Sequence, residues 1–194
     1  MGEMMETILH RRTIRRFREE QIKEKELQEI LEAGMYAPCA GGRQGVLFVV
    51  SQDREVNYRL GKIKRANFQP KMATATAYVS REQPSIADDP DIKNAFYDAP
   101  TVVTLFAPKD FLFAKEDAAM AAENMMLAAD ALGIGSCYIG AGWLAFADPF
   151  GQEVLRKWAV RGDYFAVAQV LLGYPLNEQH PKAKPRKEAR IFLF

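Results

Sequence analysis

The spacing of apolar residues along the chain predicts amphipathic helices alternating with short buried strands. Between residues 23 and 37 the apolar residues recur every three or four positions, which predicts a helix. Pro38 ends this helix, because the residue before a proline avoids helical backbone angles. Apolar runs typical of buried strands occur at 46–50 and 100–106, and further strands are predicted at 136–140 and 164–172.

Further helices are predicted at 4–12, 54–68 and 150–159, the last with Pro149 at its start. The segment 118–132 differs from these, since it is rich in alanine and apolar almost all the way round, with Asp117 as its predicted cap. A helix of that kind is buried on every side. We therefore expect it at the centre of a dimer, covered by its own subunit and a partner; a monomeric core helix is the alternative.

Two segments do not fit this alternation. The mixture of Ser, Gln, Pro and Asp between 70 and 90 predicts a loop or lid. The apolar residues 191–194 are expected to pair with a sheet, either that of their own chain or that of a partner. The chain contains no internal repeat and no linker, so residues 1–194 are expected to form a single domain.

Composition narrows the classes of function. The formal net charge of +1 over 194 residues does not favour polyanion binding by the molecule as a whole. The cysteines, Cys39 and Cys137, and the histidines, His10 and His180, are far apart in the sequence, so neither a disulfide framework nor a metal site is predicted. Signal-peptide and transmembrane patterns are lacking. We expect a cytoplasmic protein that binds neither membrane nor nucleic acid.

Two basic clusters, Arg11–Arg16 and Lys184–Lys187, are suited to holding one phosphate between them. A guanidinium group binds phosphate oxygens in pairs. Charge-assisted hydrogen bonds contribute about 1.5–3 kcal/mol each. Three or four of them approach the roughly 8 kcal/mol of a micromolar complex. Solvated basic faces are the alternative for each cluster, and a nucleic-acid-binding module is another, although the rest of the chain offers no matching basic stripe.

Small residues in the loop 37–44 leave room for a flat ring to approach the backbone. Within it, Gln44 offers both a donor and an acceptor. A nucleophilic role for Cys39 is disfavoured, because nothing in the sequence places a base beside it. The run Gly133–Ser136 follows a helix, whereas a dinucleotide-binding loop follows a strand, so it is interpreted as a helix C-cap.

Four motifs in this order resemble the nitroreductase family over nearly the whole chain. The family signature R-R-S-x-R-x-F corresponds to Arg11–Phe17, and A-P-S-A-x-N-x-Q-P-W corresponds to Ala37–Val46. The mid-chain N-x-x-L-A-A and L-G-L-G-S-C elements correspond to Asn124–Cys137. The late L-G-Y-P corresponds to Leu172–Pro175 and precedes Lys184-Pro185-Arg186.

The resemblance implies an α+β fold with a mostly antiparallel central sheet flanked by helices, in an intertwined homodimer with two FMN molecules at its interface. The implied FMN contacts come from several parts of the chain and from both subunits. They are Arg11, Arg12, Thr13, Lys184 and Arg186 at the phosphate; Arg15 at the pyrimidine edge; Pro38, Cys39, Ala40 and Gln44 from the partner subunit; and the backbone around Ile139 and Gly140 at the reactive ring nitrogen.

The resemblance also implies a reaction. FMN would carry the chemistry, which accounts for the lack of an evident catalytic acid, base or nucleophile in the protein. NADH or NADPH would give a hydride to FMN and leave, and a small-molecule acceptor such as a nitroaromatic or a quinone would then take the electrons in a ping-pong cycle. Two alternatives stay open: a flavin store or sensor without turnover, and a specialised enzyme for dehalogenation or flavin breakdown with residues 70–90 as its specificity lid.

The chain departs from the family pattern in the loop 37–46. Cys39 stands for the family's serine, Gly42 for its asparagine, and Gly45-Val46 for its Pro-Trp. The glycine removes an amide that would contact the flavin. We therefore predict that FMN affinity is reduced but not abolished.

Overall fold

A computed structural model describes residues 2–69, 82–177 and 180–194, and its centre is a four-stranded sheet. The strand order is β1-β2-β4-β3, and every pairing is antiparallel, which confirms the predicted α+β architecture. Each strand lies within about two residues of its predicted range. The bounds are β1 Leu47–Ser51, β2 Thr101–Pro108, β3 Gly135–Ile139 and β4 Tyr164–Gly173.

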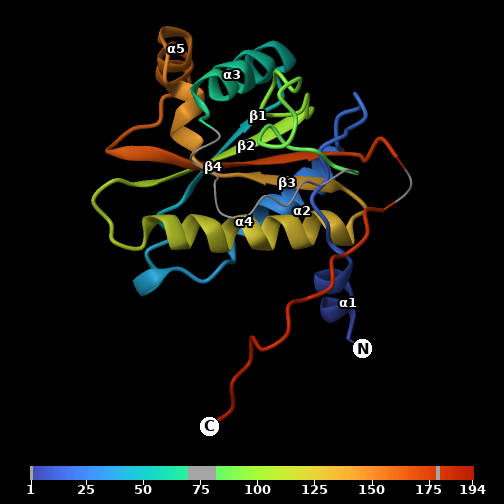
Figure 1. Cartoon of the computed structure of the whole chain (residues 1–194). Helices are drawn as coiled ribbons and strands as arrows, with labels where there is room; N and C mark the ends of the chain where they lie inside the picture. Colours follow the sequence, from blue (N-terminus) through green and yellow to red (C-terminus); the bar gives the residue numbers. More distant parts are fainter. Residues whose placement is uncertain (1, 70–81, 178–179) are drawn as a thin grey trace.

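Helices cover both faces of this sheet (Figure 1). On one face lie α2 Glu24–Met35 and α4 Ala114–Ala131, and on the other lie α3 Arg54–Asn67 and α5 Pro149–Trp158. Neighbouring residues of β4 point to opposite faces, so Val170 packs into the α2–α4 core and Leu171 into the other. Within the described ranges, no helix has the length and apolar character to cross a membrane.

The segment after α1 Glu3–His10 runs along the free edge of β3. Thr13 forms a parallel bridge with Ser136, and the Ile14 N–H donates to the Ser136 carbonyl at 2.9 Å. The absence of a side chain on Gly135 permits this approach, since a Cβ there would lie 2.9 Å from a methyl carbon of Ile14. The chain thereby fixes the basic turn beside the end of the sheet.

The C-cap interpretation of the glycines after α4 is confirmed. Gly133 has a φ of +73°, the left-handed conformation that favours glycine at this position. The Ile134 N–H donates to the Ala129 carbonyl at 2.8 Å, which closes the helix end. This turn therefore ends α4 and delivers the chain into β3.

One sequence prediction is wrong, and one of the two alternatives for the C-terminal residues is excluded. Asp117 does not cap α4, because the helix begins at Ala114 and Asp117 lies inside it, 3% exposed. Residues 191–194 are exposed and form no strand with the described part of their own chain, so pairing with a partner stays a prediction. The short helix η3 Gly142–Phe146 was not predicted. Of the proposed lid at 70–90, residues 70–81 lie outside the described residues, and residues 82–90 form turns.

Candidate functional site

The two basic clusters lie together, although more than 160 residues separate them in the sequence. They line one pocket of about 390 Å³, which we call the basic cradle. The extended segment after α1 supplies one wall, and the segment after His180 supplies the other. The residues predicted at the phosphate that line the cradle are Arg11, Arg12, Thr13, Lys184 and Arg186. Arg15, predicted at the pyrimidine edge of the ring, lines it as well.

Two guanidinium groups of the cradle have unused donors. Within the described part of the chain, the Nε atoms of Arg12 and Arg15 are buried and have no hydrogen-bond partner. The rest of Arg15 is held by Gln83, whose side-chain and main-chain oxygens accept from its backbone N and its Nη1, each at 2.6 Å. Buried donors are seldom left unpaired. The cradle is therefore built to receive an acceptor.

One acid also lines the cradle. Asp88 directs its Oδ2 at the backbone N and the hydroxyl of Ser85, at 2.9 and 2.7 Å. These two bonds hold the carboxylate within its own turn. The remaining charged side chains of the cradle are cationic, so an anion is the ligand that it favours.

The loop predicted to contact the ring lies elsewhere. Pro38, Cys39 and Gln44 line a separate pocket of about 580 Å³ beside α2 and the first part of α4. None of the described residues lines both this pocket and the basic cradle. The Ala40 N–H donates to Asp117 Oδ1 at 2.9 Å, which ties the loop to α4. Asp117 is thus a positioning residue for the loop that the sequence assigned to another role.

The cysteines offer no activated nucleophile. Cys39 is half-buried, its Sγ accepts from the Gln44 N–H at 3.3 Å, and both histidines lie on the cradle side of the molecule. Burial raises the pKa of the Cys137 thiol to about 11, which keeps it protonated. These observations agree with a site whose chemistry does not come from a protein thiol.

The loop 37–44 and the basic turn, the two halves of the predicted site, lie near opposite ends of α4. The loop 37–44 is bound at Asp117, near the start of the helix. The basic turn lies near its end, where His10 Nδ1 is 2.9 Å from Asp130 Oδ2. With a rise of about 1.5 Å per residue, these two positions are about 20 Å apart. A single chain therefore does not bring the loop 37–44 to the predicted phosphate residues.

The backbone at Ile139 and Gly140, at the end of β3, rests on a buried lysine that the sequence did not single out. Lys64 of α3 is 2% exposed, and its Nζ donates to the carbonyls of Gly140 and Ala141 at 2.8 Å and to Gln169 Oε1 at 3.0 Å. Burial lowers the pKa of Lys64 from 10.5 to about 7, because the charged form loses hydration.

This lysine fixes the direction of the turn. The carbonyl and N–H of a trans peptide point in opposite directions, so a Gly140 carbonyl held by Lys64 turns the Ala141 N–H away from the core. Among the described residues, none accepts a hydrogen bond from that N–H. Ala141 also has a φ of +53°, a left-handed conformation rare for alanine. The turn thus presents a free donor at the position where the resemblance places the ring nitrogen.

Comparison with known proteins decides the family. The sequence profile of the nitroreductase family matches residues 8–174. The chain belongs to the nitroreductase family. A protein of Archaeoglobus fulgidus, provisionally named an NADH dehydrogenase/NAD(P)H nitroreductase, is 30% identical over 181 residues, which cover 92% of this chain and 89% of that protein.

Solved nitroreductase structures share the fold. A nitroreductase from Bacteroides fragilis with bound FMN matches with a TM-score of 0.80 and 28% identity over 100% of both chains. A second, from Desulfitobacterium hafniense and also with bound FMN, matches with a TM-score of 0.81 and 24% identity over 100% of both chains. At the latter identity the likeness supports the fold alone. The nitroreductase assignment made from the four motifs is confirmed.

Proposed function

We propose that the chain is an FMN-dependent oxidoreductase that passes electrons from NADH or NADPH to a small organic acceptor, such as a nitroaromatic or a quinone, by a ping-pong mechanism. The observation that carries the proposal is the basic cradle, with the unpartnered Nε atoms of Arg12 and Arg15. The FMN bound to the Bacteroides fragilis relative supports the choice of cofactor.

The donors of the cradle fit a phosphate group. Arg11, Arg12 and Thr13 would bind its oxygens from one side, and Lys184 and Arg186 from the other. Arg15 would place positive charge beside the pyrimidine edge of the ring, where it favours electron gain. FMN, when bound, supplies the hydride and electron transfer that the side chains do not offer.

A homodimer would complete the site. If α4 packs against the same helix of a second copy in the antiparallel direction, the start of each helix lies beside the end of the other. The loop 37–44 of one copy then approaches the basic cradle of the other. This arrangement accounts for half-sites that one chain keeps about 20 Å apart along α4.

The exposed apolar surface agrees with such a dimer. Helix α1 buries none of its residues and exposes Met5 and Leu9 by 46% and 51%. On α4, Met120 is 38% exposed, and the neighbouring Ala119 and the Glu123 one turn later are exposed as well. Exposed apolar side chains on these two helices agree with an interface there. The alanine-rich helix is thus buried by its own sheet on one side and left for a partner on the other.

The visible absorption spectrum of the purified protein, before and after addition of FMN, tests the proposal. We expect a bound flavin that NADH or NADPH bleaches under anaerobic conditions and that a nitroaromatic or quinone reoxidises. Binding of riboflavin as tight as that of FMN would contradict the phosphate role of the cradle. A chain that takes up no flavin would refute the proposal as a whole.

The flavin store or sensor is the second candidate, and the altered loop favours it. Gly42 lacks the amide that the family pattern places there. Bound FMN that neither nicotinamide reduces, in protein that otherwise binds the cofactor stoichiometrically, would decide for this alternative.

A further inference from the structure

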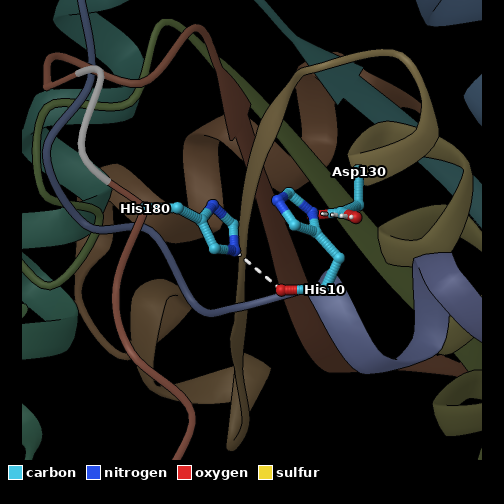
Figure 2. Close-up of side chains that lie close together, drawn as sticks. All are labelled: His10, Asp130 and His180. Atoms are coloured by element: carbon cyan, nitrogen blue, oxygen red, sulfur yellow. Dashed lines mark hydrogen bonds and ion pairs between the residues drawn. The ribbon is translucent and has the colours of Figure 1, made fainter.

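The chain contains two histidines, and the fold brings both to one aspartate (Figure 2). His10 is the last residue of α1, Asp130 lies in the last turn of α4, and His180 begins the described segment that carries the basic residues of the cradle. One ligand atom from each of the three side chains lies within 4.8 Å of the others. No sequence spacing signals this cluster, because its members are separated by 120 and 50 positions.

The carboxylate is nearly buried, whereas the imidazoles are more accessible. Asp130 has a side chain 10% exposed, and its Oδ2 lies 2.9 Å from Nδ1 of His10, whose side chain is 60% exposed. His180 Nε2 lies 2.7 Å from the backbone carbonyl of His10. The two rings stack with centroids 3.9 Å apart and planes at 18°. A nearly buried carboxylate thus faces two imidazoles that remain open to solvent.

Two imidazoles and one carboxylate are ligands typical of a divalent transition metal, whereas calcium and magnesium prefer oxygen ligands alone. Zinc takes nitrogen ligands at about 2.0–2.1 Å and carboxylate oxygens at about 2.0–2.2 Å. The 2.9 Å between His10 Nδ1 and Asp130 Oδ2 is close to the spacing of two such ligands. An imidazole nitrogen binds a metal ion in the plane of its ring, and two stacked rings do not point to one ion. His180 therefore has to rotate out of the stack to become the third ligand.

We propose that His10, Asp130 and His180 form a binding site for a divalent transition-metal ion such as Zn²⁺, with water completing its coordination. The site does not depend on the flavin function. Because the ligands belong to segments far apart in the sequence, the ion would link the segment after His180 to the end of α1 and the end of α4.

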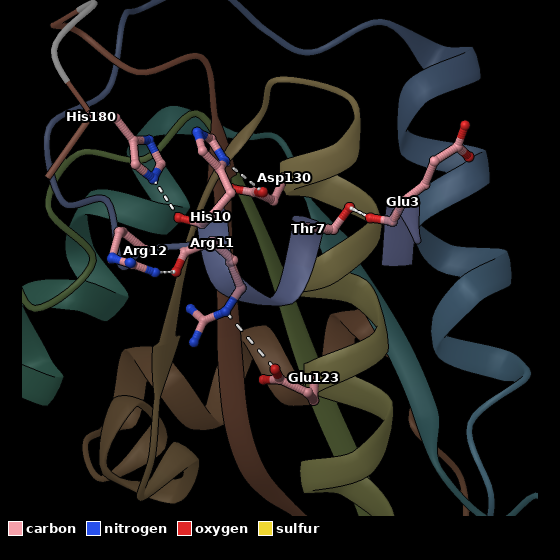
Figure 3. A network of polar contacts seen from close by, with 8 residues as sticks. All are labelled: Glu3, Thr7, His10, Arg11, Arg12, Glu123, Asp130 and His180. Atoms are coloured by element: carbon pink, nitrogen blue, oxygen red, sulfur yellow. Dashed lines mark hydrogen bonds and ion pairs between the residues drawn. The ribbon is translucent and has the colours of Figure 1, made fainter. Parts of the chain in front are cut away.

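The proposed metal site lies next to the basic cradle (Figure 3). Arg11 and Arg12 directly follow His10, and Pro181 to Lys184 directly follow His180, so the two walls of the cradle start at the metal ligands. Arg11 points toward Glu123, with 3.9 Å between Nε and Oε1, and Glu123 lies about two turns before Asp130 on α4. Fixing both walls lowers the entropy lost when a phosphate orders them. This consequence rests on the proposed function.

Calorimetric titration of Zn²⁺ into chelator-treated protein at pH 7.5 tests the site. We expect one ion per chain with an affinity in the micromolar range, and weakening by at least tenfold in His10→Gln, Asp130→Asn and His180→Gln. Glu123→Gln is the matched control, because it removes a carboxylate from the same helix without touching the histidines. No saturable binding, or equal binding by all four variants, overturns the proposal and leaves a proton-bridged His10–Asp130 pair as the explanation of the cluster.

Co²⁺ provides a second readout that needs no flavin. We expect visible d–d absorption bands that saturate at one ion per chain, and loss of these bands in His180→Gln. Bands unchanged in that variant would overturn the assignment of His180.

Zinc-loaded protein should also bind FMN at least threefold more tightly than chelator-treated protein, with riboflavin affinity unchanged. Equal FMN affinities would overturn the proposed effect of the ion on the cradle. A chain that binds zinc but no flavin overturns the proposed function alone.

Discussion

The basic cradle and the loop 37–44 are assembled in opposite ways. The cradle joins segments more than 160 residues apart within one chain, and it contains the buried donors of Arg12 and Arg15. The loop is continuous in sequence, and it is held at the other end of α4 by Asp117. Under the proposed function, phosphate recognition would be complete in one subunit, whereas the ring contacts of the loop would need a second copy. Flavin binding should fail in two distinguishable ways, depending on which region is changed.

Met120→Glu should have the largest effect, because it would disrupt the proposed dimer interface that brings the loop of one copy to the cradle of the other. Met120 is 38% exposed on α4, and an unpaired carboxylate buried there costs about 3–5 kcal/mol in each copy. We expect a monomer that retains no FMN, measured by light scattering and by absorbance. Tyr58→Glu is the control, because Tyr58 is 43% exposed on α3, across the sheet. A Met120→Glu dimer with full FMN content would rule out an interface at α4.

Arg12→Ala should abolish most of the cradle's contribution while leaving the dimer intact. The lost charge-assisted bonds are worth about 3 kcal/mol, which corresponds to a weakening of FMN binding by about 100-fold. Riboflavin, which lacks the phosphate, should bind as it does to the unmodified protein. Arg16→Ala is the matched control, since Arg16 belongs to the same basic run but does not line the cradle. Similar losses for both flavins would mean that Arg12 supports the fold rather than the phosphate.

Lys64→Met tests the turn that belongs to neither region. It strands the carbonyls of Gly140 and Ala141 and should lower the free energy of unfolding by about 2 kcal/mol. The pKa of about 7 in the folded state lies below the value of 10.5 expected of the unfolded chain. The unfolded state therefore binds more protons between these values, so the free energy of unfolding of the unmodified protein gains a contribution that rises with pH from about 7 to 10.

Urea denaturation at several pH values measures this contribution. The difference in unfolding free energy between the unmodified protein and Lys64→Met should increase with pH across that window. Lys62→Met, an exposed change on the same helix, should show no such difference. A pH-independent difference would mean that Lys64 stays charged in the folded protein, stabilised by its three oxygen acceptors.

The contrast between the two regions also explains what the sequence could predict. Strand and helix positions follow from local periodicity, and the cradle from the chemistry of arginine runs. Lys64 was missed because its neighbours Lys62 and Arg65 are also basic, as on a solvated helix face. The one sign of its burial is its position four residues after Leu60, on the buried face of α3. Asp117 was misassigned because its partner, Ala40, lies in a distant loop. Such pairings depend on tertiary packing, which local patterns do not encode.

Gly42→Asn should have the smallest effect, and it tests whether the altered loop weakens ring recognition. Gly42 has a φ of +63°, a conformation that asparagine tolerates better than most residues, and a Cβ there meets nothing within 4 Å. The restored amide should strengthen FMN binding by about fivefold, equivalent to about 1 kcal/mol. The same gain is expected for riboflavin, because the contact proposed for the loop is with the ring and not with the phosphate.

Gly133→Asn is the matched control for this change. Gly133 also has a positive φ, of +73°, with open space around its Cβ position, but it lies at the end of α4 away from the loop. The two variants share the backbone cost of replacing glycine, so only Gly42→Asn should change flavin affinity. A gain for FMN without a gain for riboflavin would place the new amide at the phosphate and would contradict the division of labour between the loop and the cradle.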